Sequence, residues 1–267
     1  VACEYLGLSP DDINVIEGDT GEVKNGFGTG GSRVSALGSS AAYQAAGVLI
    51  EKAKVLASHL LESAESDLEF ADGVFTIAGT DRTISLKQVA AASFDPSRCP
   101  DGFELGLGGE AEYKAEVANY PNGCHISEVE VDPETGKISV VRYTVVDDVG
   151  VVVNPLLLDG QIHGGVAQGL GQILFEDIAY DPASGQMLSG SFMDYAMPRG
   201  DNIPAIYVEA NCVPTSTNPL GIKGAGEAGT IGAMPCVMNA AVDALSSLGI
   251  NQLDMPLTPV RVWQAIQ

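Results

Sequence analysis

The sequence predicts an α+β fold of two subdomains, each a mixed β-sheet with packed helices. We expect the first subdomain over residues 1–105 and the second over residues 106–267. Three observations carry this prediction: a long helical pattern in the first part, a series of strand patterns in the second, and a stretch rich in glycine and proline over residues 94–110 that is typical of a linker. With 267 residues, 45% of them hydrophobic, the chain can bury a sizeable core.

The clearest element is a helix over residues 40–64. Its apolar residues recur at spacings of three and four, with charged residues between them, so one face should be buried. Further on, apolar residues alternate around Asp72-Gly73, a two-residue turn typical of a β-hairpin. Ser85 and Gln88 have the spacing of a capping box, which predicts the start of a short helix.

Alternating apolar and polar residues predict six further strands. They cover residues 13–19, 111–118, 124–131, 138–147, 187–195 and 205–213. Among them, residues 156–176 keep a helical spacing of apolar residues despite five glycines. Because each internal glycine costs a helix about 1 kcal/mol relative to alanine, we expect this helix to pack closely against another backbone or a ligand.

The most informative stretch runs from Pro219 to Pro235. It places Lys223 and Glu227 in a glycine-rich run, and an apolar helical pattern follows, so Glu227 should lie at or just before a helix start. A carboxylate held by glycines and shielded by apolar neighbours suits a general base. The alternative is a glycine-rich turn with a capping glutamate. The run contains Gly221, Gly224, Gly226, Gly229 and Gly232.

A second glycine-rich stretch, residues 20–32, delivers Ser32 and Arg33 to the start of the long helix. A helix start presents unpaired N–H groups and the positive end of the helix dipole, which suits a phosphate or a polar heterocycle. A generic nucleotide binder is disfavoured, since Lys223 is followed by Gly224 rather than by the Ser or Thr of a P-loop.

Charge and cysteine content narrow the class of protein. The formal net charge of −22 argues against nucleic-acid binding, which needs a basic surface. No apolar run approaches the roughly 18 residues of a membrane span. Five cysteines without a C-x-x-C pair, and three histidines, give no zinc-ligand spacing. We therefore expect a soluble, cytoplasmic protein with reduced thiols and no metal ion held by its own side chains.

The run from Pro219 to Gly232 closely resembles the active-site glutamate motif of the xanthine oxidase family of molybdenum hydroxylases. Within that family it looks most like the molybdopterin-binding large subunit of the aerobic carbon-monoxide dehydrogenase group. The resemblance covers essentially the whole chain and implies the fold of that subunit's molybdopterin-binding domain. Its other motifs are residues 28–33, 147–150, 154–155, 159–171 and 190–198.

The resemblance implies a role for each matched residue. Glu227 matches the catalytic glutamate, a general base that deprotonates the attacking oxygen. The alternatives for the other matches are conformational glycines and surface caps, and Arg33 could equally pair with a neighbouring acid. The implied cofactor-binding residues are Gly30, Gly31, Ser32 and Arg33 in one loop, Gln161, and Lys223, Gly224 and Gly226 before the glutamate.

The resemblance also implies cofactors and partners. Molybdopterin cytosine dinucleotide would hold molybdenum through its own sulfurs, and iron–sulfur clusters and FAD would lie only on partner subunits. The implied enzyme oxidises or hydroxylates carbon monoxide, an aldehyde or an N-heterocycle, with water as the oxygen source. The chain matches the C-terminal half of the large subunit, so the expected partners are the first half of that subunit, the iron–sulfur and flavin subunits and a small-molecule substrate. The alternative is a non-catalytic scaffold or assembly fragment that needs a partner chain to complete any site.

Overall fold

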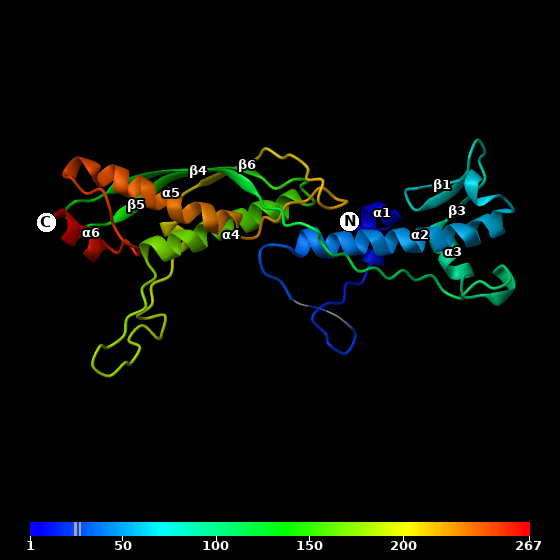
Figure 1. Ribbon diagram of the computed structural model, residues 1–267, viewed down its shortest axis with the longest axis horizontal. Coiled ribbons are helices and arrows are strands. Elements are labelled where there is room, and N and C mark those ends of the chain that lie inside the picture. Colours follow the sequence, from blue (N-terminus) through cyan, green and yellow to red (C-terminus); the bar gives the residue numbers. More distant parts are fainter. Residues whose placement is uncertain (24–25, 27) are drawn as a thin grey trace. The chain divides into compact units, whose positions relative to one another are not determined.

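The computed structural model describes residues 1–23, 26 and 28–267 (Figure 1). The chain forms two compact units, one of Val1–Val117 with Asn218–Leu220 and one of Ala118–Thr217 with Gly221–Gln267. Helices and two small sheets build them, which confirms the predicted α+β class. The subdomain boundary near residue 105 stays a prediction.

The first unit contains a three-stranded antiparallel sheet, β1 (Leu68–Ala71), β2 (Val74–Ile77) and β3 (Thr83–Ser85). The predicted turn Asp72-Gly73 joins β1 to β2 with φ angles of 49° and 76°, the left-handed values that this hairpin requires. The helices and helical turns are α1 (Ala2–Leu6), η1 (Pro10–Asp12), the π-helical η2 (Val34–Gly38), α2 (Ser39–Leu61), η3 (Glu65–Asp67), α3 (Leu86–Ala92) and η4 (Pro96–Arg98).

Helix α2 carries the core of the first unit and confirms the predicted amphipathic helix. Its Ala53 and Leu56 are fully buried and belong to one hydrophobic cluster with Phe75 of β2 and Val89 of α3. Helix α3 begins at the predicted capping box, where the Ser85 hydroxyl accepts a hydrogen bond from the N–H of Gln88. Local sequence signals therefore predict α2, the β1–β2 hairpin and the start of α3 in this unit.

The second unit contains a mixed sheet. Strand β5 (Ile138–Asp148) pairs antiparallel with β4 (Asn122–Val131) and parallel with β6 (Ile206–Ala210). Helices α4 (Pro155–Leu174) and α5 (Ala228–Leu245) pack against each other and run side by side along this sheet (Figure 1). The remaining turns and helices are η5 (Gly200–Asn202), η6 (Ser246–Leu248) and α6 (Pro259–Ile266).

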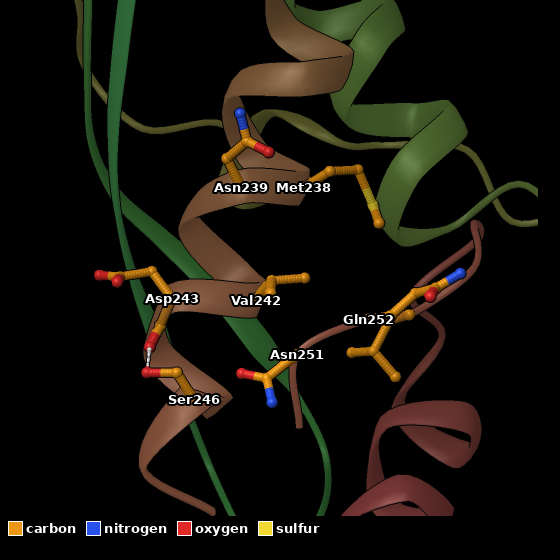
Figure 2. A pocket seen from close by; sticks show the side chains of 8 residues that line it. Met238, Asn239, Val242, Asp243, Ser246, Asn251 and Gln252 are labelled. Atoms are coloured by element: carbon orange, nitrogen blue, oxygen red, sulfur yellow. Dashed lines mark hydrogen bonds between the residues drawn. The ribbon is translucent and has the colours of Figure 1, made fainter. Parts of the chain in front are cut away.

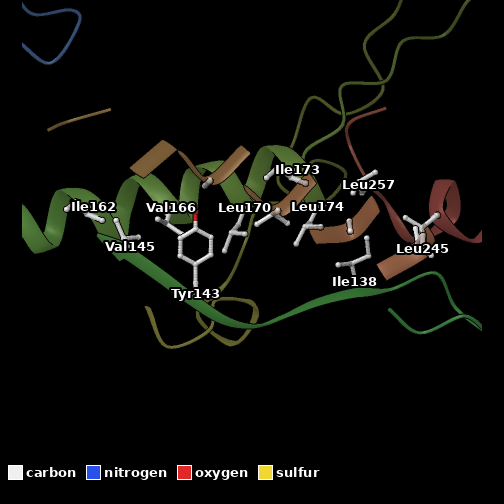
Figure 3. Close-up of a cluster of buried hydrophobic side chains, with 14 residues drawn as sticks. Ile138, Tyr143, Val145, Ile162, Val166, Leu170, Ile173, Leu174, Leu245 and Leu257 are labelled. Carbon is white, nitrogen blue, oxygen red and sulfur yellow. The ribbon is translucent and has the colours of Figure 1, made fainter. Parts of the chain in front are cut away.

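The core of the second unit lies between the sheet and the two helices. Figure 3 shows Tyr143 and Val145 of β5 pointing toward Val166 and Leu170 of α4, and all four residues are fully buried. Burying a Val or Leu side chain of this kind stabilises a fold by about 1.5–3 kcal/mol. This cluster fixes α4 and α5 on the strands that precede them.

The glycines of α4 lie in two different surroundings. A Cβ on Gly165 would lie 2.9 Å from the amide nitrogen of Thr230, and one on Gly229 would lie 2.5 Å from the carbonyl oxygen of Ile162, so α4 and α5 approach closely at this point. A Cβ on Gly160 or Gly164 would meet no atom within 4 Å in the described residues. Close helix packing, one of the two expectations, is therefore confirmed for part of the glycine set only.

Three predicted strands are wrong. Residues 13–19 and 111–118 have no strand in the structure, and residues 187–195 contribute only an isolated bridge between Met187 and Tyr180. Alternation of apolar and polar residues describes a half-buried surface, but a strand also needs a neighbouring strand to satisfy its N–H and C=O groups. The predictions at 124–131, 138–147 and 205–213 are confirmed by β4, β5 and β6.

One segment, Ala228–Leu248, is long and apolar enough to cross a membrane by length and composition alone. It comprises α5 and η6. Its apolar residues Ala233, Val237, Ala241 and Leu245 belong to the core of the second unit. Packing against α4 and the sheet accounts for these four residues, but only 22% of the most apolar window of the segment is buried.

Candidate functional site

Glu227 lies at the start of α5, as predicted. It is the N-cap residue, and its carbonyl oxygen accepts a hydrogen bond of 2.9 Å from the N–H of Ile231. Its side chain makes no capping hydrogen bond to α5, a helix whose residues are all described, so the capping alternative lacks its defining contact. Glu227 is exposed, so the expectation that apolar neighbours shield it is wrong.

Lys223 anchors the chain four residues before Glu227. Its ammonium donates a hydrogen bond of 2.6 Å to Asp148 Oδ2, and the two side chains are only 13% and 11% exposed. The Lys223 N–H donates to the carbonyl oxygen of Val149, and Ile222 forms a bridge with Gly150. The segment before Glu227 is thus tied to the end of β5 through side chain and backbone.

Asp148 is held as a carboxylate by its neighbours. Burial raises its pKa, but the Lys223 ammonium and the N–H groups of Val213 and Gly150 outweigh burial and bring the pKa to about 2. The two backbone bonds measure 3.0 Å and 2.9 Å. Asp148 is therefore ionised throughout the neutral range and forms a charged pair with Lys223.

Gln161 and Glu227 lie at the same crossing of α4 and α5. Ile162 follows Gln161 and packs its carbonyl against Gly229, two residues after Glu227. Gln161 is exposed and flanked by Gly160, where the helix carries no side chain. Gly226 is exposed, whereas Gly224 is buried. The structure therefore brings together the predicted residues of the second unit around one exposed carboxylate.

The predicted loop Gly30–Arg33 belongs to the first unit. Gly31 and Ser32 have consecutive left-handed φ angles of 69° and 57°, and Arg33 precedes η2. Such a curved backbone turns successive N–H groups toward one side, as in anion-binding nests. A Cβ on Gly30 or Gly31 would meet nothing within 4 Å in the described residues. Residues 24, 25 and 27 of the predicted 20–32 stretch lie outside the described residues.

The sequence did not predict the polar residues that support the segments around Glu227. Asp148 was recognised only as part of a motif, and nothing in the sequence links it to Lys223, 75 residues away. His125 and Asp147 form a buried pair on β4 and β5 that no local pattern indicates. His163 is exposed, and its Nδ1 lies 2.7 Å from the carbonyl oxygen of Asp159 within α4.

A pocket of about 480 Å³ lies elsewhere, toward the C-terminal end of α5 (Figure 2). Its lining includes Met238 and Val242 of α5 and Asn251 and Gln252 of the following segment. Met238 lies eleven positions after Glu227, about 16 Å along the helix axis. This pocket is therefore separate from the candidate site.

The donor set of the described residues fits a cofactor that brings its own metal ligands. No group of three or more His, Cys, Asp or Glu side chains in this part of the chain could hold a metal ion. The site instead offers N–H groups on glycine backbone, an amide at Gln161 and a carboxylate at Glu227. These groups suit a large polar ligand.

Comparison with known proteins shows similarity over the whole chain. The chain is 36% identical to the 6-hydroxypseudooxynicotine dehydrogenase complex subunit gamma of Paenarthrobacter nicotinovorans, covering 100% of this chain and 34% of that protein. It superposes on carbon monoxide dehydrogenase from Oligotropha carboxidovorans with a TM-score of 0.92 and 32% identity, covering 98% of this chain and 32% of that one. It also superposes on quinoline 2-oxidoreductase from Pseudomonas putida 86 with a TM-score of 0.90 and 36% identity, covering 100% and 34% of the two chains.

The chain spans about a third of the length of these relatives, a smaller share than the half that the resemblance implied. Residues 1–204 match the family described as the molybdopterin cofactor-binding domain. The chain therefore belongs to the molybdopterin cofactor-binding domain family, found in the molybdenum hydroxylases that the sequence resembles.

Proposed function

We propose that the chain forms the cofactor-binding and base-carrying part of a molybdenum hydroxylase, an oxidoreductase that uses water as its oxygen source. The observation that carries this proposal is Glu227, an exposed carboxylate on a backbone anchored before it by Lys223 and after it by helix α5. A base of this kind must reach the proton it removes while its own position stays fixed. Family membership supplies the cofactor that such a base would serve.

The residues present fit that cofactor. When bound, the molybdenum cofactor supplies a redox centre that takes up two electrons from the substrate. The N–H groups of Gly30, Gly31 and Ser32, with Arg33, would hold its anionic and polar groups in the first unit. The second unit would contribute the Gln161 amide and the backbone at Gly224 and Gly226, while Lys223 keeps this segment in place.

The role of Glu227 is that of a general base. Its carboxylate would accept the proton of the attacking oxygen and release it to water. The exposed backbone at Gly226 leaves room for a ligand next to the carboxylate. Close packing of α4 on α5 would hold Gln161 and Glu227 in a constant relation during that transfer.

The finer features of the enzyme also belong to this proposal. We propose the cytosine dinucleotide form of molybdopterin, a partner that supplies the first half of the subunit, and iron–sulfur and flavin partner subunits. The relative named as subunit gamma of a complex supports a multi-subunit enzyme. Five free cysteines support a cytoplasmic location, where thiols stay reduced.

Substrate screening should begin with N-heterocycles. The relatives at 36% identity carry 6-hydroxypseudooxynicotine and quinoline in their names, while the carbon monoxide dehydrogenase structure stands at 32%. Carbon monoxide and aldehydes remain the other two substrate classes of the proposal. Turnover of each class by the assembled enzyme, measured with an artificial electron acceptor, decides among them.

Glu227→Gln tests the proposal directly. The substitution keeps the size of the side chain but removes the base, so turnover in the assembled enzyme should fall by at least about 100-fold. Molybdenum and released cytidine nucleotide should stay at the wild-type amount. The matched control is Glu130→Gln, an exposed glutamate on β4, which should keep full turnover. Normal turnover of Glu227→Gln refutes the base assignment, and an assembled wild type without molybdenum supports the scaffold alternative.

A further inference from the structure

Three polar side chains lie in a row on the helix-facing side of β4 and β5. His125 Nε2 lies 3.3 Å from Asp147 Oδ1, and its Nδ1 lies 2.8 Å from the Tyr143 hydroxyl. The side chains of His125 and Asp147 are only 7% and 4% exposed, and Tyr143 is fully buried. In the sheet register His125 lies opposite Val145 of β5, and Tyr143 and Asp147 lie two positions before and after Val145. Side chains two apart on a strand share a face, so His125, Tyr143 and Asp147 point to the same side of the sheet.

The hydrogen positions in this row follow from its acceptors. A carboxylate only accepts, so His125 Nε2 carries the hydrogen that is donated to Asp147. In the neutral imidazole, Nδ1 then accepts from the Tyr143 hydroxyl. Burial, the Cys236 thiol and the Asp147 charge raise the pKa of Tyr143, which therefore keeps its hydrogen. The contacts on both ring nitrogens fix the orientation of the His125 ring.

Two glycines in the surrounding backbone leave room for these three side chains. A Cβ on Gly123 would overlap Asp147 Oδ1, and a Cβ on Gly232 of α5 would overlap the His125 ring. Asp147 Oδ2 is buried without a hydrogen-bond partner in the described part of the chain. A buried carboxylate with an unsatisfied oxygen lowers the stability of a fold, so apolar side chains at these positions would give a more stable fold. A contribution to stability alone therefore does not explain why these three polar side chains are buried together.

The row ends at the start of the helix that begins with Glu227. The His125 ring packs flat against Gly232, which lies five residues after Glu227 and has no side chain to separate them. Asp148, next to Asp147, binds Lys223 four residues before Glu227. Two consecutive aspartates at the end of β5 thus act on both flanks of Glu227, one through Lys223 and one through His125.

We propose that Asp147 and His125 are positioning residues that fix the first turns of α5, and with them the direction in which Glu227 presents its carboxylate. The catalytic consequence rests on the proposed function of Glu227, but the structural statement does not. Asp147 and His125 act through Gly232 and the backbone of α5.

Hydrogen–deuterium exchange of the protein in its assembled state tests the structural statement. In His125→Ala the amides of residues 228–232 should exchange at least about tenfold faster, because the support of these turns is removed. Amides of residues 240–245, at the other end of α5, should keep their wild-type rates and serve as the internal control. His125→Gln offers an amide N–H to Asp147 and should restore part of the protection.

A double-mutant cycle tests the contact itself. Gly232→Ala adds a methyl group where the His125 ring lies, so alone it should accelerate exchange at residues 228–232. In the His125→Ala background the ring is gone, and the same substitution should have little further effect. Additive effects would show that the ring does not support the helix through Gly232 and would overturn the proposal.

The kinetic readout separates positioning from folding. In His125→Ala and in the milder Asp147→Asn, kcat should fall about 10- to 100-fold, since small displacements of a catalytic group have this effect. KM and molybdenum content should stay at wild-type values. Unchanged exchange at residues 228–232, or equal acceleration along all of α5, overturns the proposal. If Glu227→Gln keeps normal turnover while exchange still changes locally, the base assignment fails and the positioning of the helix start stands.

Discussion

At the scale of single residues, the site depends on charges that are neutralised locally. Asp148 and Lys223 form a nearly buried pair, and Asp148 also accepts two backbone N–H groups. Breaking a buried pair by removing one partner leaves an uncompensated charge, which is more harmful than replacing both. The Glu227 segment therefore depends on a pair that lies outside the reacting groups.

The Asp148 pair makes stability dependent on pH. The pKa of Asp148 lies at about 2 in the fold against an ordinary value of 3.8, so the unfolded chain binds this proton first as the pH falls. The resulting stabilisation is fully present above about pH 4 and is lost as the pH falls toward 2. It amounts to at most about 2 kcal/mol, and less where water screens the pair.

Chemical denaturation at pH 5 and pH 2.5 should show this contribution. The wild type should lose more free energy of unfolding over this interval than Asp148→Asn, because the variant no longer takes up the proton. Asp254→Asn, an exposed matched control, should follow the wild type. Parallel pH profiles for the wild type and Asp148→Asn would contradict the assignment.

At the scale of elements, the crossing of α4 and α5 decides where Gln161 and Glu227 lie. Gly165 and Gly229 allow this crossing because neither carries a side chain. Gly164, one residue before Gly165, faces open space instead. A glycine at the crossing and a glycine that faces open space should therefore respond to substitution in opposite directions.

Gly229→Ala should destabilise the second unit by about 1–3 kcal/mol, because its methyl group meets the Ile162 carbonyl. Gly164→Ala should stabilise α4 by about 0.5–1 kcal/mol, because alanine loses less backbone entropy in a helix. Thermal or chemical denaturation of both variants measures the difference. Equal effects of the two substitutions would show that the helices do not approach as described.

The same elements show how far sequence reasoning reaches. Three features were predictable because their signals lie within a few residues: the amphipathic pattern of α2, the Asp72-Gly73 turn and the helix start at Glu227. The false strand at residues 111–118 had a suitable pattern but no neighbouring strand. The Asp148–Lys223 pair was unpredictable because sequence spacing carries no information on contacts across 75 residues.

At the scale of the whole molecule, the net charge of −22 lowers the stability of the fold. Repulsion among the acidic side chains opposes compact structure, and salt screens it over about 10 Å at 0.1 M. We expect the midpoint of thermal unfolding to rise by a few degrees between about 10 mM and 200 mM sodium chloride. Potassium chloride should act equally, and a midpoint independent of salt would show that the charges are already balanced by local pairs.

The parallel pairing of β5 with β6 has a consequence for folding. Between them lie α4 and a long irregular segment, and Lys223 reaches Asp148 only after β6 has been synthesised. Contacts of such sequence separation close large loops, and they form slowly. We therefore expect the geometry around Glu227 to be among the last parts of the chain to mature. In a nascent or partly folded chain the Glu227 carboxylate would then have no defined direction. Any reactivity of Glu227 would be delayed until the second unit has folded.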